Sequence, residues 1–179
     1  MVSSQSLIRV KKQGYSVPSR LMGHTLRVEL YEAELKVYLG GDFLLGRPRM
    51  RGDRGSQVDF RHVIGALLRK PGAFHHSRHR EALYPSVVFR SAYDRLRADP
   101  GERPGTIEYL QVLKWAAEET VEKVEAALRR PLENPSKWRA KEIRDQLVPP
   151  ARPVVEMADL APSLNVYDAL LEGEVAQVG

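Results

Sequence analysis

From residue 5 to residue 49 the chain alternates between apolar and polar side chains with a period of two, which is typical of half-buried β-strands. The clearest apolar series are Ile8 and Val10, then Leu26, Val28 and Leu30, then Leu35, Val37 and Leu39. We expect turns at Gln13-Gly14, Met22-Gly23 and Gly40-Gly41-Asp42, because glycine accepts a positive φ without steric cost. Four or five short strands within residues 1–50 predict a small SH3-like β-barrel.

The pattern changes after residue 50. Residues 51–57 contain no apolar residue and two glycines, so they predict a linker. The segment from Val58 to Leu68 predicts a short helix with Asp59 near its start, and Lys70-Pro71-Gly72 ends it because proline and glycine do not readily continue a helix. Residues 51–80 are therefore predicted to be a basic linker that carries one short helix.

Residues 81–147 have the apolar spacing of helices and predict a small helical bundle. Pro85 suits the first position of one helix, which Asp99-Pro100-Gly101 ends. We expect the next helices to begin at N-caps, which are Thr106, Thr120 and the pair Asn134-Pro135, the last followed by a helix with Trp138 and Ile143. The predicted fold class is thus α+β, with a strand region followed by helices.

The remaining segment, residues 148–179, is rich in proline and acidic residues. Ser163 is a candidate N-cap for a short terminal helix with an apolar side, formed by Leu164, Tyr167, Leu170 and Leu171. Such a helix either packs against its own domain or docks on another protein. Under the second interpretation, Tyr167, Leu170 and Leu171 are the candidate partner contacts.

Charge is distributed unevenly along the 179 residues. The whole chain has 28 Lys and Arg against 23 Asp and Glu, a formal net charge of +5. Residues 47–80 alone hold 9 basic and 2 acidic residues, whereas residues 81–147 hold 12 of each, and residues 148–179 hold 1 basic and 5 acidic residues. A local basic stripe of this kind favours a polyanionic partner such as nucleic acid.

The basic stripe supplies the candidate DNA-binding residues. If residues 47–51 are extended, the arginines at 47, 49 and 51 point the same way and can follow a phosphate backbone, while Arg51 or Arg54 can enter a minor groove. The full candidate set is Arg9, Lys11, Lys12, Arg47, Arg49, Arg51, Arg54, Arg61, Arg69, Lys70, Arg78 and Arg80. The alternative is a solvated basic face that only keeps the protein in solution.

The sequence gives little indication of metal binding or catalysis. His75 and His79 have the i, i+4 spacing of helical metal ligands, but Gly72 and Ser77 interrupt the helix pattern and no acidic residue stands among them. The chain has no cysteine, no glycine-rich phosphate loop and no nucleophile elbow. We therefore predict no catalytic residue, no metal site and no cofactor. Without an apolar run of about 18 residues or a secretory leader, we expect no membrane contact and a cytoplasmic location.

Longer segments of the sequence resemble a known protein family. LIRVKKQGYSVPSRLMGHTLRVELYEAELKVYLGGDFL, with YSVP at Tyr15 to Pro18 and the glycine pair Gly40-Gly41, resembles the barrel after the integrase core of IstA-type and Mu-type transposases. VIGALLRKPGAF and REALYPSVVFRSAYDRL are similar to the IstA-type continuation, and EYLQVLKWAA, VEKVEAAL and the closing YDALL are similar to its helical end.

The resemblance implies the C-terminal, non-catalytic region of a bacterial insertion-sequence transposase of the DDE superfamily. It further implies a role in transposition, with double-stranded DNA at the element ends, other transposase subunits and an AAA+ ATPase helper as partners. The catalytic core and its divalent metal would lie outside this chain.

Two other functions stay open. The chain is alternatively a protein interaction module for transposase subunits or the helper, with no DNA binding of its own. An RNA-binding protein is a third interpretation, which is disfavoured because few candidate stacking residues exist beyond Tyr31 and Tyr38.

Overall fold

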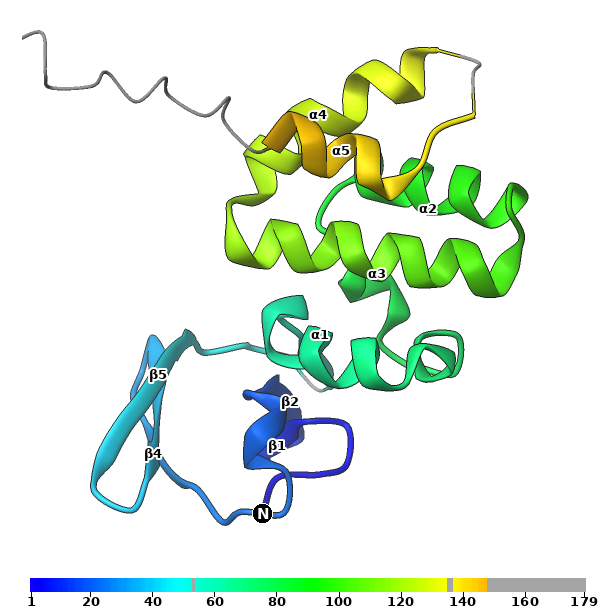
Figure 1. Ribbon diagram of the computed structural model, residues 1–179. Coiled ribbons are helices and arrows are strands. Elements are labelled where there is room, and N and C mark those ends of the chain that lie inside the picture. Colours follow the sequence, from blue (N-terminus) through cyan, green and yellow to red (C-terminus); the bar gives the residue numbers. More distant parts are fainter. Residues whose placement is uncertain (53, 135–136, 148–179) are drawn as a thin grey trace, which may run out of the picture. The chain divides into compact units, whose positions relative to one another are not determined.

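The computed structural model describes residues 1–52, 54–134 and 137–147. Strands come first and helices follow, which confirms the predicted α+β class (Figure 1). The expected terminal helix, with Ser163, Tyr167, Leu170 and Leu171, lies outside the described residues. Among the described residues, no helix is both long and apolar enough to cross a bilayer.

Six strands form two three-stranded sheets. One sheet has the order β1-β2-β6, from Leu7–Val10, Gln13–Ser16 and Gly55–Gln57, and the other has the order β3-β4-β5, from Arg27–Leu30, Glu34–Leu39 and Asp42–Pro48. Within the described residues no strand pairing joins the two sheets, so the strands do not close into one hydrogen-bonded barrel. One apolar core serves both sheets, and its buried members include Ile8, Tyr15, Val17, Leu35 and Val37.

The first hairpin turns two positions earlier than expected. Val10 pairs with Gln13, so the loop consists of Lys11 and Lys12, which have φ angles of 49° and 62°. The predicted turn at Gln13-Gly14 is wrong, because both residues belong to β2 and are buried. Glycine at position 14 serves close packing instead: a Cβ there would stand 2.8 Å from Oγ of Ser56 in β6.

The segment predicted as a linker contains the strand β6. It pairs in parallel with β2, with Gln13 opposite Gly55 and Tyr15 opposite Gln57. Its side chains are mostly exposed, so the backbone pairing to β2 fixes this strand. A search for apolar alternation overlooks such a strand because it contributes little to the core.

Five α-helices and two short 3-10 helices follow the strands, and several predicted ends are confirmed. The helices are α1 Phe60–Arg69, α2 Val87–Ala98, α3 Glu102–Glu118, α4 Val121–Glu133 and α5 Ala140–Leu147, with η2 Pro71–Phe74 and η3 Arg80–Leu83. Asp59 caps α1 and accepts a hydrogen bond from the backbone N–H of Arg61, and Thr120 caps α4. Asp99 ends α2 as expected.

Other predicted helix starts are wrong. The cap of α2 is Ser86, one residue after Pro85. Thr106 lies inside α3 and is buried, and its hydroxyl donates to the carbonyl oxygen of Glu102 at 2.6 Å. Asn134 ends α4, and Trp138 precedes α5 as a buried residue outside the helix.

The helices pack around an aromatic cluster. Phe74, Tyr84, Tyr93 and Tyr109 have ring centroids between 5.2 and 6.0 Å apart. The hydroxyl of Tyr109 donates to the carbonyl oxygen of Leu83 at 3.0 Å, which ties α3 to η3. Burial raises the pKa of Tyr84 to about 12.

Gly105 allows α2 and α3 to come together. A Cβ at this position would overlap the backbone carbonyl group of Leu96 in α2, and backbone atoms cannot move aside as a flexible side chain can. Gly65, on the exposed side of α1, has no atom within 4 Å of the equivalent Cβ position. The close contact between α2 and α3 therefore requires glycine at position 105, whereas the packing of α1 does not require glycine at position 65.

We expect Gly105→Ala to lower the free energy of unfolding by at least about 2 kcal/mol, since α2 and α3 must separate. Gly65→Ala is the matched control and should raise it by about 0.5–1 kcal/mol, because alanine favours a helix without meeting any neighbour. Urea unfolding of both variants measures the difference. Equal effects of the two substitutions would contradict the assigned close packing at Gly105.

Candidate nucleic-acid interface

Basic side chains from three separate segments converge on two adjoining hollows. The first, of about 380 Å³, is lined by Lys11, Lys12, Arg49 and Arg51 among others. The second, of about 700 Å³, is lined by Arg9, Lys12, Arg54 and Arg78 together with His79. Lys12 lines both. We call the seven residues Arg9, Lys11, Lys12, Arg49, Arg51, Arg54 and Arg78 the basic surface.

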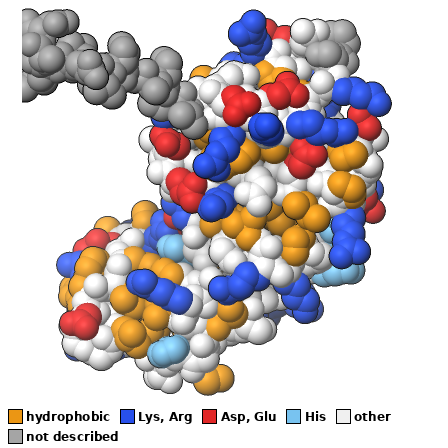
Figure 2. Space-filling model, viewed as in Figure 1, with side chains coloured by type: hydrophobic (Ala, Val, Ile, Leu, Met, Phe, Trp, Pro, Cys, Tyr) orange, Lys and Arg blue, Asp and Glu red, His pale blue; other side chains and the backbone are white. Residues whose placement is uncertain are grey.

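The basic surface has a strongly one-sided charge. Among the described residues, no Asp or Glu lines either hollow, and none of the seven basic side chains forms an ion pair. The helical part differs: Figure 2 shows Lys and Arg intermixed with Asp and Glu over α4 and α5. Since like charges held together raise the local positive potential, the basic surface suits a polyanion.

The β1–β2 hairpin presents two of these charges at its tip. Lys11 and Lys12 both have positive φ angles and exposed side chains. Glycine and asparagine are the usual residues for such a two-residue turn, and lysine there costs about 1 kcal/mol or more per position. The hairpin therefore carries two cations at a place where the backbone alone favours other residues.

The segment after β5 is fastened to β2. The backbone N–H of Met50 donates to the Tyr15 hydroxyl at 2.8 Å, and the side-chain amide of Gln13 donates to the Gly52 carbonyl oxygen at 2.7 Å. Arg49 donates from its backbone to Ala33 and from its guanidinium to the carbonyl oxygen of Tyr31. These bonds hold Arg49 and Arg51 beside the hairpin tip.

Arg47 has a different position. Its guanidinium lies 2.7 Å from the Asp59 carboxylate, and its side chain lines neither hollow. It thus does not share a direction with Arg49 and Arg51, although the extended pattern predicted this. Asp59 is also bonded to β2, because the Ser16 hydroxyl accepts a hydrogen bond from the backbone N–H of Asp59 at 2.8 Å.

His62 joins the same network. Its Nε2 lies 3.4 Å from the Arg47 guanidinium, and because arginine only donates, Nε2 must accept and the ring proton sits on Nδ1. From there it donates to the Ser16 hydroxyl, 2.9 Å away. We call Ser16, Arg47, Asp59 and His62 the latch, since they connect β2 and β5 with the start of α1.

Both titratable members of the latch have shifted pKa values. Burial lowers the pKa of His62 below 6.5, with Asp59 opposing this effect and Arg47 adding to it. Burial by itself would raise the pKa of Asp59, but hydrogen bonds from Arg47 and the backbone of Arg61 outweigh it and bring the pKa below 3.8. The latch therefore holds an ionised Asp59 beside a neutral His62 near pH 7.

The other predicted DNA-binding residues lie outside the two hollows. Arg61 is stacked on Phe60 at 5.1 Å and lies 3.9 Å from Asp59, and Arg80 lies 3.9 Å from Glu81. Arg69 and Lys70 stand at the end of α1. The predicted set is thus divided into seven residues that come together and five that do not, and DNA contact by any of them stays a prediction.

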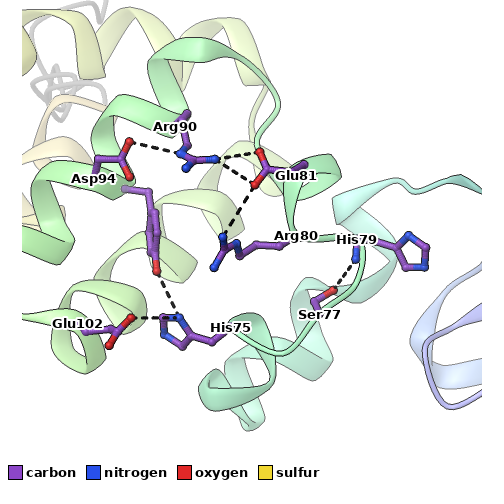
Figure 3. A network of polar contacts seen from close by, with 9 residues as sticks. His75, Ser77, His79, Arg80, Glu81, Arg90, Asp94 and Glu102 are labelled. Carbon is purple, nitrogen blue, oxygen red and sulfur yellow. Dashed lines mark hydrogen bonds and ion pairs between the residues drawn. The ribbon is translucent and has the colours of Figure 1, made fainter.

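The histidines after η2 do not face a common point. His75 lies 2.9 Å from the Thr106 hydroxyl and 3.6 Å from the Glu102 carboxylate, whereas the ring of His79 points away from it (Figure 3). Within the described residues, no group of three or more His, Cys, Asp or Glu side chains is arranged to hold a metal ion. His75 therefore links η2 to α3.

Sequence reasoning missed the residues that support the basic surface. Gln13 and Tyr15 anchor the Arg49–Gly52 segment through side-chain bonds to its backbone, and Ser16 supports the latch. All three lie in β2, the first part of which the sequence predicts as a turn. The only available signal was the polar residue type at buried strand positions, and this does not reveal a partner 35 or more residues away.

Comparisons with known proteins place the strand region in context. Residues 1–59 match the family model described as Mu transposase, C-terminal domain. The chain is also 40% identical over 99 residues to the uncharacterized protein y4jA/y4nE/y4sE of Sinorhizobium fredii (strain NBRC 101917 / NGR234). That alignment covers 53% of this chain and 20% of the relative, so the chain spans about a fifth of the relative's length. No solved structure matches.

The family match covers the strands and most of the basic surface. Of its seven residues, only Arg78 lies beyond the matched segment. The match thus makes the strand region similar to the C-terminal domain of Mu transposase.

The latch predicts how stability depends on pH. Because the unfolded chain binds a proton at His62 near pH 6.5 and the folded chain does so only at lower pH, stability falls as the pH drops below 6.5. Asp59 acts in a lower window, since its contribution is present above pH 3.8 and is lost below it.

We therefore expect wild type to lose more unfolding free energy between about pH 7.5 and pH 5.5 than His62→Gln does. His76→Gln, which changes an exposed histidine, is the control and should behave as wild type. Urea unfolding at several pH values gives the comparison. A His62→Gln profile that parallels wild type would show that His62 is not held neutral.

Proposed function

We propose that this chain is the DNA-binding and assembly region of a bacterial insertion-sequence transposase of the IstA type. The observation that carries the proposal is the basic surface, where seven cations from three segments meet with no carboxylate among the described lining residues. The match of residues 1–59 to the Mu transposase C-terminal domain supports the same role.

DNA binding through this surface would rest on phosphate contacts. The hairpin tip with Lys11 and Lys12 stands next to Arg49 and Arg51, so adjacent phosphates of one backbone can each meet a cation. Arg54 lies at the second hollow and is the candidate for entering a minor groove. Because phosphates carry no sequence information, this surface would fix the position of the duplex more than it selects a sequence.

The chemistry of strand cleavage would belong to another part of the transposase. We expect the DDE core and its divalent metal outside these residues, so this chain acts without a cofactor and is not an enzyme on its own. Its partners would be DNA at the element ends, other transposase subunits and an AAA+ ATPase helper in the bacterial cytoplasm. Tyr167, Leu170 and Leu171 remain the proposed helper contacts.

A protein interaction module without DNA binding is the second candidate function. One observation favours it: Phe43 is 58% exposed and Tyr31 is 47% exposed. Exposed aromatic residues are enriched in protein interfaces. The two candidates differ in whether removal of basic charges changes affinity for DNA.

The hairpin tip allows charge to be removed without loss of fold. Replacing Lys11 and Lys12 with Asn and Gly installs the preferred turn residues, so the free energy of unfolding should rise by about 1–2 kcal/mol. Affinity for duplex DNA should fall, and the slope of log K against log salt should become shallower by roughly 1.8, or 0.9 per lost phosphate contact. Fluorescence anisotropy with a labelled duplex at several salt concentrations measures both quantities.

Arg69→Ala/Lys70→Ala removes the same charge outside the basic surface and is the matched control. It should leave the salt slope unchanged. If both double variants lose the same affinity for duplex DNA, only the net charge of the protein matters. Unchanged affinity after substitution of Lys11 and Lys12 would contradict the role of the hairpin tip in DNA binding. Absence of duplex binding by wild type at low salt would favour the interaction module.

A further inference from the structure

The outer face of the β3–β4–β5 sheet carries a group of side chains that the basic surface does not include. Alternate residues of these strands, such as Val28, Leu35 and Val37, point into the core. The opposite face carries Arg27 and Glu29 from β3, Glu34, Lys36 and Tyr38 from β4, and Phe43 from β5, with Tyr31 just after β3. We call these seven residues the aromatic face.

Strand register brings the members of the aromatic face together. Arg27 pairs with Tyr38, which pairs with Phe43, and Glu29 pairs with Lys36 in the next row. The rings of Tyr38 and Phe43 meet edge to face with centroids 5.7 Å apart. The tip of the Phe43 ring also reaches over Gly46, where a Cβ would lie 3.9 Å away. The aromatic face is therefore one continuous patch.

The patch is more apolar than a solvated face requires. Single exposed apolar residues are common in folded proteins, but two largely exposed aromatic residues on one face of a sheet, Tyr31 and Phe43, are typical of an interface. Tyrosine, phenylalanine and arginine are enriched at such interfaces and supply much of their binding energy. Water contact with Phe43 is unfavourable by the hydrophobic effect, and a partner that covered the ring would remove it.

The charges on the aromatic face favour a protein over nucleic acid. It has two basic and two acidic side chains, which lie in pairs: Arg27 with Glu29 at 3.5 Å and Lys36 with Glu34 at 3.4 Å. The carboxylates would repel phosphate. Two ring faces are also covered already, because Arg27 stands 4.6 Å over Tyr38 and Lys36 stands 5.1 Å over Tyr31. Base stacking on this face is thus disfavoured.

We propose that the aromatic face binds the same face of a second copy of this chain. Equal numbers of opposite charges lie beside the aromatic rings on this face, which makes the face complementary to itself. In a two-fold dimer the same surface of both copies meets, so basic groups of one copy can lie against acidic groups of the other. The Tyr38 and Phe43 rings would then form the buried centre of the interface.

Charge reversal tests this contact and identifies the partner. Arg27→Glu/Lys36→Glu leaves only acidic charges on the face, and Glu29→Lys/Glu34→Lys leaves only basic ones. Each double variant alone should fail to dimerise because like charges meet, and an equimolar mixture of the two should form a heterodimer. Sedimentation velocity of the full chain over a concentration series detects all three species.

Phe43→Ser provides a second, independent measurement. Because the ring is largely exposed in one copy, the variant should fold, while its dimer dissociation constant rises about tenfold or more. Val87→Ser, which changes an 81% exposed residue in α2, is the control and should leave the dissociation constant unchanged. Affinity of monomeric Phe43→Ser for duplex DNA should equal that of monomeric wild type, since the basic surface is intact.

A monomeric wild-type protein at about 100 µM would overturn the proposal, since specific dimers bind well below this concentration. Dimerisation that survives both Phe43→Ser and charge reversal would overturn it as well, by placing the contact elsewhere. Loss of affinity for nucleic acid in monomeric Phe43→Ser would instead assign this face to base stacking. The sedimentation results do not depend on whether the basic surface binds DNA, so dimerisation is tested separately from the proposed function.

Discussion

The arrangement of the basic surface depends on the ion pair between Arg47 and Asp59. This pair joins the last strand of one sheet to the cap of α1, so the backbone between them must form a loop that is closed at both ends. Ser16 and His62 hold the same junction from β2 and α1. The closed loop carries Arg49, Arg51 and Arg54 past the β1–β2 hairpin. Arg47 is thus used for structure, whereas Arg49, Arg51 and Arg54 are available to bind a polyanion.

The strand region presents two surfaces of contrasting physical character. The charged side chains of the basic surface are all cations among the described residues, whereas the aromatic face combines rings with paired charges of both signs. Phosphate is attracted to the first and repelled by the carboxylates of the second. A transposase that assembles on DNA has to bind DNA and other subunits at the same time. The separation of the two surfaces in our proposals allows both.

Local chemistry made part of this structure predictable. The period of two located the strands around Val28 and Val37 because their apolar faces build the core, and Asp59 and Thr120 cap helices through bonds within three residues. Other parts of the fold could not be predicted from the sequence because they depend on contacts between residues far apart in the chain. Strand β6 exists because of its pairing with β2, and Thr106 is internal to α3, where its hydroxyl contacts the His75 ring and the Glu102 carbonyl oxygen instead of capping the helix.

The basic surface could also be predicted only in part from the sequence. Clustering of arginines from 47 to 54 predicted a basic stripe, but only the fold shows that Arg47 faces Asp59 while Lys11 and Lys12 join Arg49 and Arg51. The hairpin tip is also hard to foresee, since lysine is an uncommon residue at two successive positive φ angles. A sequence pattern gives the number of charges, and tertiary contacts decide which of them share a surface.

The most direct test of the central claim is to map where DNA touches the protein. Backbone amide resonances of the isotopically labelled chain, recorded with and without a short duplex, report contacts residue by residue. We predict shifts concentrated in residues 9–14, 49–56 and 77–80, with little change in residues 31–43. Shifts confined to the helices α2 to α5, or to the aromatic face, would contradict DNA binding through the basic surface.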